Sequence, residues 1–223
     1  MWKPKGFLTF STLDEWAKRG VDVLLSAVGL AVLVPLFGVI ALLIRLDSSG
    51  PVLYRGIRTG RWGHPFAMCK FRTMVMHAET LGGASTADDD PRITRIGRLL
   101  RKTKLDELPQ LINVLRGEMS IVGPRPEVPQ YVAMFGKEEQ VILTVRPGMT
   151  DWASLWDIDE GAVLVGSANA ERDYLERIRP QKLRLQLEYV RRRSLRVDLQ
   201  IIAQTVATVF RRRSRRADSP VEE

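Results

Sequence analysis

Residues 23–44 read VLLSAVGLAVLVPLFGVIALLI, a run of 22 residues that contains no charged side chain. As a continuous helix this run would be about 33 Å long, enough to cross a hydrocarbon core of roughly 30 Å. The run is too long for the apolar part of a signal peptide, and Arg45 follows it where a cleavage site would need small residues. The sequence therefore predicts a membrane helix.

Pro35 lies in the middle of this run and predicts a kink, because it removes an amide donor and clashes with the carbonyl of Ala31. Lys18 and Arg19 precede the run and Arg45 follows it. Basic residues near both ends favour keeping both ends on the cytoplasmic side. Two arrangements stay open: a re-entrant helix that returns to its own side, and a single kinked span, which membranes also tolerate.

The composition of the whole chain excludes several classes of protein and kinds of site. The 223 residues include 34 Lys and Arg against 26 Asp and Glu, so the net charge is +8. At 45% hydrophobic and 27% charged, the chain is too apolar for disorder and too charged for a polytopic transporter. One cysteine and two histidines exclude a disulfide framework and a Cys/His zinc site. The excess of basic residues leaves two kinds of binding partner open: nucleic acid, or an anionic membrane surface together with phosphorylated substrates.

Both ends of the chain carry features of membrane contact. Thr12 and Glu15 have capping-box spacing, and nearby aromatic side chains suit an interface. Near the C-terminus, apolar residues recur at helical spacing and five arginines follow, a pattern suited to anionic lipid. A core helix with a solvated basic end is the alternative. The aromatic residues are Phe7, Phe10 and Trp16, the apolar ones Leu199, Ile202, Val206, Val209 and Phe210, and the arginines Arg211, Arg212, Arg213, Arg215 and Arg216.

A β-hairpin is predicted from residues 52–57 and 66–74, which flank the turn sequence TGRWGHP. Within the second strand Lys70 and Arg72 are two residues apart, so both should project from one face. Two adjacent cations suit a diphosphate, although a solvated strand face has the same pattern. Cys69 in this strand is interpreted as a small core residue. His64 and His77 are isolated in the sequence.

An acidic pair follows a block of cations. A basic helical pattern over residues 93–104 runs into LDELPQL, and Pro109 predicts that a new helix starts around Asp106. The surrounding cations and the first-turn amides should then depress the pKa of Asp106 and leave its carboxylate available as a nucleophile. The ordinary alternative is that Asp106 and Glu107 only cap the helix.

Two loops hold further candidates. Pro124 and Pro126 bracket Arg125 and fix the backbone around it, which suits bidentate contact with a phosphate; a rigid surface loop is the alternative. The loop with aspartates at positions 88–90 is either an acidic turn or a metal site. No P-loop, GxSxG or GxGxxG pattern competes with these residues.

Four blocks together resemble the bacterial sugar transferase family, the monotopic phosphoglycosyl transferases that act as polyprenyl-phosphate sugar-1-phosphate transferases. The blocks are KFRTM (70–74), DPRITRIGRLLRKTKLDELPQL (90–111), GEMSIVGPRPE (117–127) and RPGMTDWAS (146–154). They occur in the family's order, and the resemblance covers about residues 18–209. It implies that a UDP-sugar binds with Mg²⁺, that a carboxylate takes its phosphosugar and releases UMP, and that polyprenyl (undecaprenyl) phosphate then receives the phosphosugar at the start of glycan assembly.

The resemblance also implies roles for single residues. Asp106 matches the nucleophile, and Glu107 would position the metal or assist proton transfer, so the pair forms the expected metal site. Arg101 matches a phosphate contact, Arg125 a residue of the nucleotide pocket, and Lys70 and Arg72 the basic strand motif. The family's membrane helix is re-entrant and broken by a proline, here Pro35; the serine that often precedes that proline is Val34 in this chain.

The expected fold is therefore α+β and predominantly helical, monotopic, with one Pro-kinked re-entrant helix, surface amphipathic helices and a small β-hairpin. The expected regions are an N-terminal interfacial segment (1–20), the re-entrant helix (21–46), a cytoplasmic catalytic domain (47–195), and an amphipathic helix with a basic tail (196–223). The expected location is the cytoplasmic face of the bacterial inner membrane. The expected partners are the donor, the acceptor and anionic lipid, without nucleic acid; a homodimer is compatible with the pattern.

Two questions stay open at this stage. The rival hypothesis is a non-catalytic, membrane-anchored basic protein that binds anionic lipid or nucleic acid. The sugar is not determined by the sequence, although Trp152, Trp156 and residues 157–168 are candidates for sugar selectivity.

Overall fold

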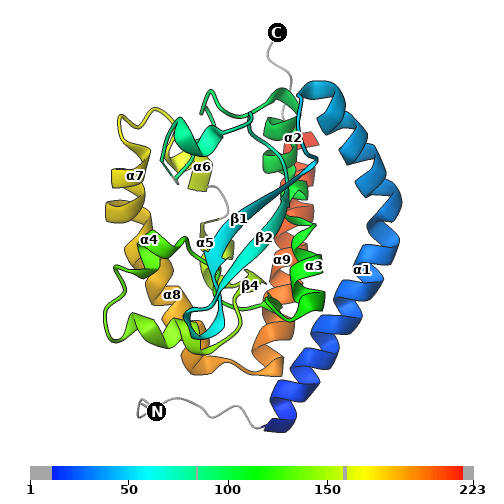
Figure 1. Cartoon of the computed structure of the whole chain (residues 1–223). Coiled ribbons are helices and arrows are strands. Elements are labelled where there is room, and N and C mark those ends of the chain that lie inside the picture. Colours follow the sequence, from blue (N-terminus) through cyan, green and yellow to red (C-terminus); the bar gives the residue numbers. More distant parts are fainter. Residues whose placement is uncertain (1–11, 84, 158–159, 218–223) are drawn as a thin grey trace.

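The structure is a computed structural model that describes residues 12–83, 85–157 and 160–217 (Figure 1). These residues are mainly helical with two small sheets, which confirms the predicted α+β class. The strands are β1 (Leu53–Thr59), β2 (Pro65–Phe71), β3 (Ser120–Val122) and β4 (Gly148–Thr150). The helices are α1 (Thr12–Asp47), α2 (Arg95–Thr103), α3 (Gln110–Arg116), α4 (Pro129–Val132), α5 (Trp152–Trp156), α6 (Glu160–Val163), α7 (Ala170–Asp173), α8 (Arg179–Arg192) and α9 (Leu195–Ala217).

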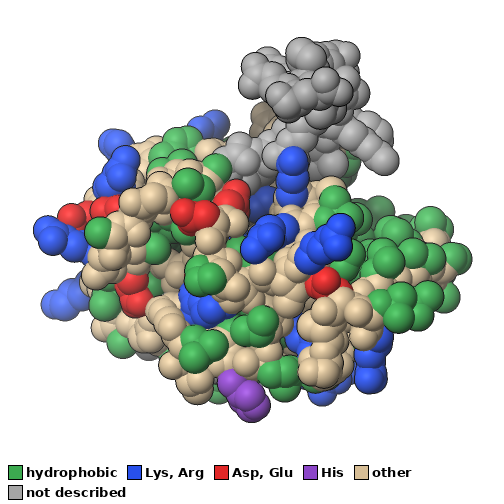
Figure 2. Space-filling view, turned by 90° about the horizontal axis from the view of Figure 1, so that it is seen from above, with side chains coloured by type: hydrophobic (Ala, Val, Ile, Leu, Met, Phe, Trp, Pro, Cys, Tyr) green, Lys and Arg blue, Asp and Glu red, His purple; other side chains and the backbone are tan. Residues whose placement is uncertain are grey.

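Helix α1 follows one side of the molecule as a single long element. Pro35 lies inside it, and Figure 1 shows the helix bending on its way along that side, as expected where proline removes an amide donor. The helix is long and apolar enough to cross a membrane, and only 11% of its most apolar window is buried. Figure 2 shows the exposed hydrophobic side chains crowding the edge that α1 forms. A helix of this kind is not the core of a soluble domain.

Both ends of α1 are fastened to the same folded body. Near the N-terminal end, the Nζ of Lys18 lies 2.6 Å from the carboxylate of Asp198 in α9. At the C-terminal end, the carboxylate of Asp47 accepts a hydrogen bond of 2.9 Å from the amide of Ile96 in α2. Ile40 and Ile44 of α1 are buried in one hydrophobic cluster with Phe71 and Leu100.

The predicted hairpin is confirmed. β1 and β2 are antiparallel, in register from Leu53 opposite Phe71 to Thr59 opposite Pro65. A 3-10 turn at Arg61–Gly63 connects them, with Trp62 and Gly63 in the left-handed region. β2 ends at Phe71, short of the predicted end at residue 74, so Arg72 lies beyond the strand.

The segment that carries the acidic pair is built from two short helices. Thr94 caps α2 by accepting a hydrogen bond from the amide of Gly97. α2 ends at Thr103, its C-cap Lys104 has a φ of 57°, and the 3-10 turn Leu105–Glu107 follows. α3 starts only at Gln110, with Pro109 as its N-cap. The expectation that a helix starts around Asp106 was therefore wrong: the left-handed Lys104 makes a tight turn there, and Pro109 delays the next helix.

A second, parallel pair of strands was not expected from the sequence. β3 pairs with β4, Ser120 opposite Gly148 and Val122 opposite Thr150. Val122 belongs to a core cluster with Tyr189 of α8 and Ile201 of α9. Each strand has only three residues, too few for a periodic pattern to reveal them.

Helix α9 combines the two alternatives weighed for the C-terminal segment. Ile201, which is not on the predicted apolar stripe, is fully buried in the core, and Asp198 is buried beside it. Leu199 and Val206 of the stripe are 62% and 50% exposed, while Ile202 is partly buried. The helix thus packs on the core through one face and leaves part of the stripe uncovered. Phe7 and Phe10 lie outside the described residues, as do the side chains of Val209, Phe210 and the five arginines.

Candidate active site

Glu107 lies between two cations that come from other parts of the chain. Its Oε1 accepts a hydrogen bond of 3.0 Å from the Nζ of Lys70, the cation near the end of β2. The guanidinium of Arg125 donates to both oxygens of Glu107, with 3.0 Å from Nη1 to Oε2. Despite the desolvation that comes with burial, Arg125 and Lys70 hold the pKa of Glu107 well below its usual range. Glu107 is therefore ionised and rigidly held.

Asp106, the preceding residue, has a different environment. Its side chain is 5% exposed, and its Oδ1 has no hydrogen-bond partner among the described residues. Burial raises the pKa of Asp106, and the charge of Lys70, with smaller contributions from Arg101 and Lys104, opposes that shift. The depressed pKa expected for Asp106 was thus wrong, because removal from water outweighs the nearby cations; the depressed carboxyl is its neighbour Glu107.

The four cations around the pair come from three parts of the chain. Lys70 belongs to β2, Arg101 to the last turn of α2, Lys104 to the turn after it, and Arg125 to the loop after β3. Arg101 makes one long contact of 3.5 Å to the carbonyl of Thr86 and acts on Asp106 through its charge. The fold thus brings Lys70, Arg101 and Arg125 to the acidic pair.

Arg72 is not brought to the acidic pair. Its guanidinium donates to the carbonyls of Ser48 and Ser49 and to the hydroxyl of Ser48, where it closes the turn after α1. The side chain is 5% exposed. The expectation that Lys70 and Arg72 serve one diphosphate from one strand face does not match this arrangement, since β2 ends between them and the two side chains have separate partners.

The acidic loop at residues 88–90 has other contacts. The carboxylate of Asp90 holds the guanidinium of Arg92, with 2.7 Å between Oδ2 and Nη2. The Oδ2 of Asp89 accepts from the amide of Gly166 at 3.3 Å. Throughout residues 12–217 apart from the three undescribed positions, no group of three or more acidic, His or Cys side chains could hold a metal by itself. Of the two alternatives for this loop, these contacts favour an acidic turn over a metal site.

Sequence reasoning missed several residues around the site. Arg58 of β1 lies within electrostatic range of Glu107 and Arg125, and burial lowers the pKa of its guanidinium. Glu127, two residues after Arg125, is buried and bonded to the hydroxyl of Tyr174. Tyr174 begins the π-helical turn Tyr174–Ile178, and Lys182 donates to its hydroxyl at 3.1 Å. No sequence pattern separates Arg58 from Arg55, or Glu127 from other loop acids.

The comparison with known families agrees with the motifs. The family model described as bacterial sugar transferase matches residues 13–212, which is most of the chain. The chain belongs to the bacterial sugar transferase family. The match includes α1, the hairpin, the acidic pair and the Arg125 loop, so the site described here lies entirely within the family region.

Curated relatives of the chain carry related names. An undecaprenyl-phosphate N-acetylgalactosaminephosphotransferase of Aeromonas hydrophila is 36% identical over 208 residues, which are 92% of this chain and 46% of the relative. An undecaprenyl-phosphate glucose phosphotransferase of Komagataeibacter xylinus is 41% identical over 87% of this chain and 36% of the relative. A UDP-glucose:undecaprenyl-phosphate glucose-1-phosphate transferase of Caulobacter vibrioides is 36% identical over 86% of this chain and 69% of the relative. The chain spans less than half of the first two.

Proposed function

We propose that this chain transfers a sugar 1-phosphate from a UDP-sugar to undecaprenyl phosphate, with Asp106 as the nucleophile. The observation that carries the proposal is the buried Oδ1 of Asp106, which has no hydrogen-bond partner in the described part of the chain and lies among cations beside the ionised Glu107. The relatives are named for transfer to undecaprenyl phosphate, and those names support the donor and acceptor classes.

In the first step, an oxygen of Asp106 attacks the phosphorus that bears the sugar. A new bond joins that oxygen to phosphorus, and the bond from phosphorus to the bridging oxygen breaks, so that UMP leaves with the electron pair. Because Asp106 is buried, little water competes for its lone pairs. Lys70, Arg101 and Arg125 offset the negative charge of the approaching diphosphate.

In the second step, a phosphate oxygen of the lipid acceptor attacks the same phosphorus, and the carboxylate of Asp106 leaves. A covalent intermediate lets one site treat a soluble donor and a lipid acceptor in turn. Glu107, held by Lys70 and Arg125, keeps those two cations in place during both steps.

The residues of the site fit a magnesium ion. Oδ1 of Asp106 has no hydrogen-bond partner in the described residues, and Oε2 of Glu107 accepts only from Arg125 there. Mg²⁺ is commonly bound by one or two carboxylates together with substrate phosphates, and no larger ligand group is found in the described chain. Asp106 and Glu107 would hold the ion, which when bound supplies positive charge for the donor diphosphate.

We also propose that α1 is re-entrant and that the rest of the chain lies on the cytoplasmic face of the inner membrane. Lys18 near one end of α1 and Asp47 at the other are both bonded to the same folded body. A straight span would place these ends on opposite sides of a bilayer roughly 30 Å thick. The cations near both ends, Lys18, Arg19 and Arg45, favour the cytoplasmic side.

UMP release tests the proposal. Membranes with the full chain are given undecaprenyl phosphate and either UDP-glucose or UDP-N-acetylgalactosamine. We expect UMP release that falls by several orders of magnitude in Asp106→Asn, because the amide is not a nucleophile. The matched control Asp88→Asn, at an exposed position, should release UMP at the wild-type rate.

Mass spectrometry of the chain incubated with donor alone should show a phosphosugar adduct on Asp106. UMP release that persists in Asp106→Asn would remove this residue from the nucleophile role. Salt-sensitive association with nucleic acid, without turnover of any donor, would instead support the rival hypothesis of a basic binding protein.

A further inference from the structure

Arg58 of β1 is a cation beside the active site to which the reaction described above assigns no role. Its guanidinium makes one hydrogen bond within the described residues, 2.9 Å to the carbonyl of Ile57 next to it, and no carboxylate of that part of the chain lies within ion-pair distance. A guanidinium has five N–H donors, so most of those of Arg58 remain available for a ligand. Because burial already disfavours the charge of Arg58, this arrangement points to an anion that binds from outside the chain.

The strand register places Arg58 on the face of the hairpin that carries Lys70. Tyr54 lies opposite Lys70, and side chains two residues apart on a strand project from one face, so Tyr54, Gly56 and Arg58 share that face. Gly56 has no side chain, and both neighbours fold over it: a Cβ there would lie 3.2 Å from Nη1 of Arg58 and 3.3 Å from the hydroxyl oxygen of Tyr54. The guanidinium of Arg58 is therefore turned back along β1, toward Tyr54 and the Lys70 opposite it.

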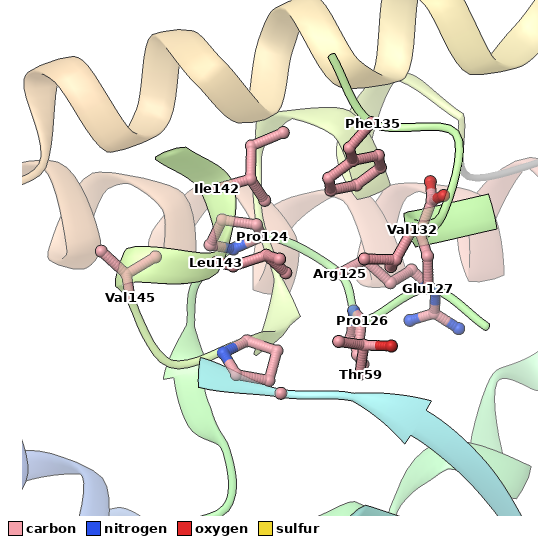
Figure 3. A pocket seen from close by; sticks show the side chains of 12 residues that line it. Thr59, Pro124, Arg125, Pro126, Glu127, Val132, Phe135, Ile142, Leu143 and Val145 are labelled. Atoms are coloured by element: carbon pink, nitrogen blue, oxygen red, sulfur yellow. The ribbon is translucent and has the colours of Figure 1, made fainter. Parts of the chain in front are cut away.

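Arg125 is the second guanidinium at this place. Among the charged groups around Arg58, Arg125 acts on it most strongly, followed by Glu107. In Figure 3 the guanidinium of Arg125 points away from the carboxylate of Glu127, which lines a small, mainly apolar pocket. The guanidinium of Arg125 donates to Glu107 instead, and Glu107 also accepts from Lys70. Three cations thus gather around one carboxylate, which leaves the group with a net positive charge.

The cations of the site fall into two groups relative to the nucleophile. Those that act most strongly on Asp106 are Lys70, Arg101 and Lys104. Arg58 and Arg125 are not among them and act on each other instead. In phosphoryl transfer the attacking and leaving oxygens lie roughly in line, on opposite sides of the phosphorus. A leaving group displaced by Asp106 therefore departs on the side away from Asp106, toward Arg58 and Arg125.

We infer that Arg58 and Arg125 form one phosphate-binding position that the reaction uses twice, first for the phosphate of the departing UMP and then for the phosphate of the lipid acceptor. The inference rests on the proposed transferase function. In the first step UMP leaves with the electron pair of the broken bond, and the two guanidiniums offset the negative charge that it gains. In the second step an oxygen of the lipid phosphate bonds to phosphorus while the carboxylate of Asp106 leaves with its electron pair. That attack must be in line with the departing carboxylate, hence from the place that UMP has left.

The experiment uses the full chain in lipid nanodiscs and follows the two half-reactions separately. The chain is mixed with donor alone, UDP-glucose or UDP-N-acetylgalactosamine, to give the rate of adduct formation, and the purified adduct is mixed with undecaprenyl phosphate to give the rate of its discharge. Equilibrium dialysis without donor or acceptor measures the affinity for UMP and for uridine, which has no phosphate. Arg58→Gln is compared with the wild type and with Arg55→Gln, a matched change at an exposed position on the other face of β1. Arg58→Lys is measured alongside and serves if Arg58→Gln does not fold.

For Arg58→Gln we expect both rates and the affinity for UMP to fall about tenfold or more, as for a lost hydrogen bond between charged groups. The affinity for uridine should stay the same, because Arg58 contacts only phosphate. This difference separates a phosphate contact from a general loosening of the site, which would weaken the binding of UMP and uridine alike. Arg58→Lys keeps the charge but loses the planar fork, so its losses should be smaller. Arg55→Gln should match the wild type throughout.

Three results would overturn the inference. An unchanged affinity for UMP in Arg58→Gln would show that Arg58 does not bind the phosphate, and equal losses of affinity for UMP and uridine would show that it only supports the fold of the site. Slower adduct formation with an unchanged rate of discharge would show that the lipid phosphate does not use this position. A wild-type chain that forms no adduct from either donor is a different failure, because it removes the proposed function itself, whereas the affinities for UMP and uridine are measured without turnover.

Discussion

Asp106 and Glu107 are neighbours in the chain, yet the fold moves their pKa values in opposite directions. Glu107 points to Lys70 and Arg125 and accepts hydrogen bonds from both, so its ionised form is stabilised. Asp106 is turned into the interior, where burial favours its protonated form. Adjacent carboxyls with separated pKa values are a common arrangement where one group reacts and the other holds charge in place.

The raised pKa of Asp106 predicts a pH-dependent gain in stability for Asp106→Asn. The folded chain binds the proton of Asp106 more tightly than the unfolded chain does, so wild-type stability falls as pH rises from the ordinary aspartate pKa of 3.8 through the raised folded pKa. Asparagine does not ionise, so the variant does not lose folding stability over this pH range. We therefore expect the Tm of Asp106→Asn to equal that of wild type below the ordinary pKa and to exceed it at neutral pH.

Thermal unfolding of both chains across a pH series measures this difference. The matched variant Asp88→Asn makes the same change of a carboxylate to an amide at an exposed position and serves as the control. A Tm for Asp106→Asn that drops below the wild-type value at neutral pH would show that ionised Asp106 stabilises the fold, contrary to the raised pKa.

Helix α2 sets the position of the acidic turn, and Gly97 sets the position of α2. A Cβ at residue 97 would lie 2.0 Å from the carbonyl oxygen of Thr73, just after β2. The backbone of α2 can approach the end of the hairpin this closely only without a side chain. Arg101 belongs to α2 and the turn at Leu105–Glu107 comes directly after it, while Lys70 belongs to β2. The contact between α2 and the end of β2 therefore keeps Arg101 and the turn beside Lys70.

Gly97→Ala should therefore destabilise the chain by about 2 kcal/mol or more, because backbone rather than a flexible side chain opposes the new methyl group. Gly20→Ala is the control: residue 20 lies inside α1, and a Cβ there would meet nothing within 4 Å, so alanine should stabilise the helix by up to about 1 kcal/mol. Denaturant unfolding of the two variants measures both effects. Equal stabilities would contradict the close approach of α2 to Thr73.

At the scale of the whole molecule, α1 has an exposed apolar side and a second side that contacts the folded body. Lys18 reaches α9, Asp22 accepts from Ser120 and the amide of Ile121, and Asp47 reaches α2. These polar contacts need both ends of the helix in the same aqueous compartment as the rest of the chain. The proposed re-entrant placement satisfies them, and a full span would break those at one end.

Cysteine labelling tests this placement. Ala17→Cys and Ser49→Cys lie at exposed positions near the two ends of α1, whereas the native Cys69 is buried and should not react. With a membrane-impermeant maleimide, we expect both positions to be labelled in inside-out vesicles and neither in right-side-out vesicles. Labelling of the two positions from opposite sides would show that α1 spans the bilayer.

The parts predicted correctly from the sequence were those encoded by neighbouring residues. The apolar run of α1, the hairpin around residues 59–65 and the basic helical pattern of α2 depend on periodicity and turn residues within one segment. The predictions that failed depended on contacts between segments. Arg72 looked like a partner of Lys70 until β2 ended between them, and the depressed pKa assigned to Asp106 belongs to Glu107.

By itself, the sequence determined that the chain carries one apolar membrane helix, a basic α+β domain and the motifs of its family, because hydropathy, charge and motif spacing are properties of the linear chain. Only the tertiary structure decided that Lys70, Glu107 and Arg125 form one ion-paired cluster, that Asp106 is buried beside it and that Glu127 faces a separate pocket. The physical reason is that burial and ion pairing join residues far apart in sequence, and a side chain's pKa follows from the neighbours that folding supplies.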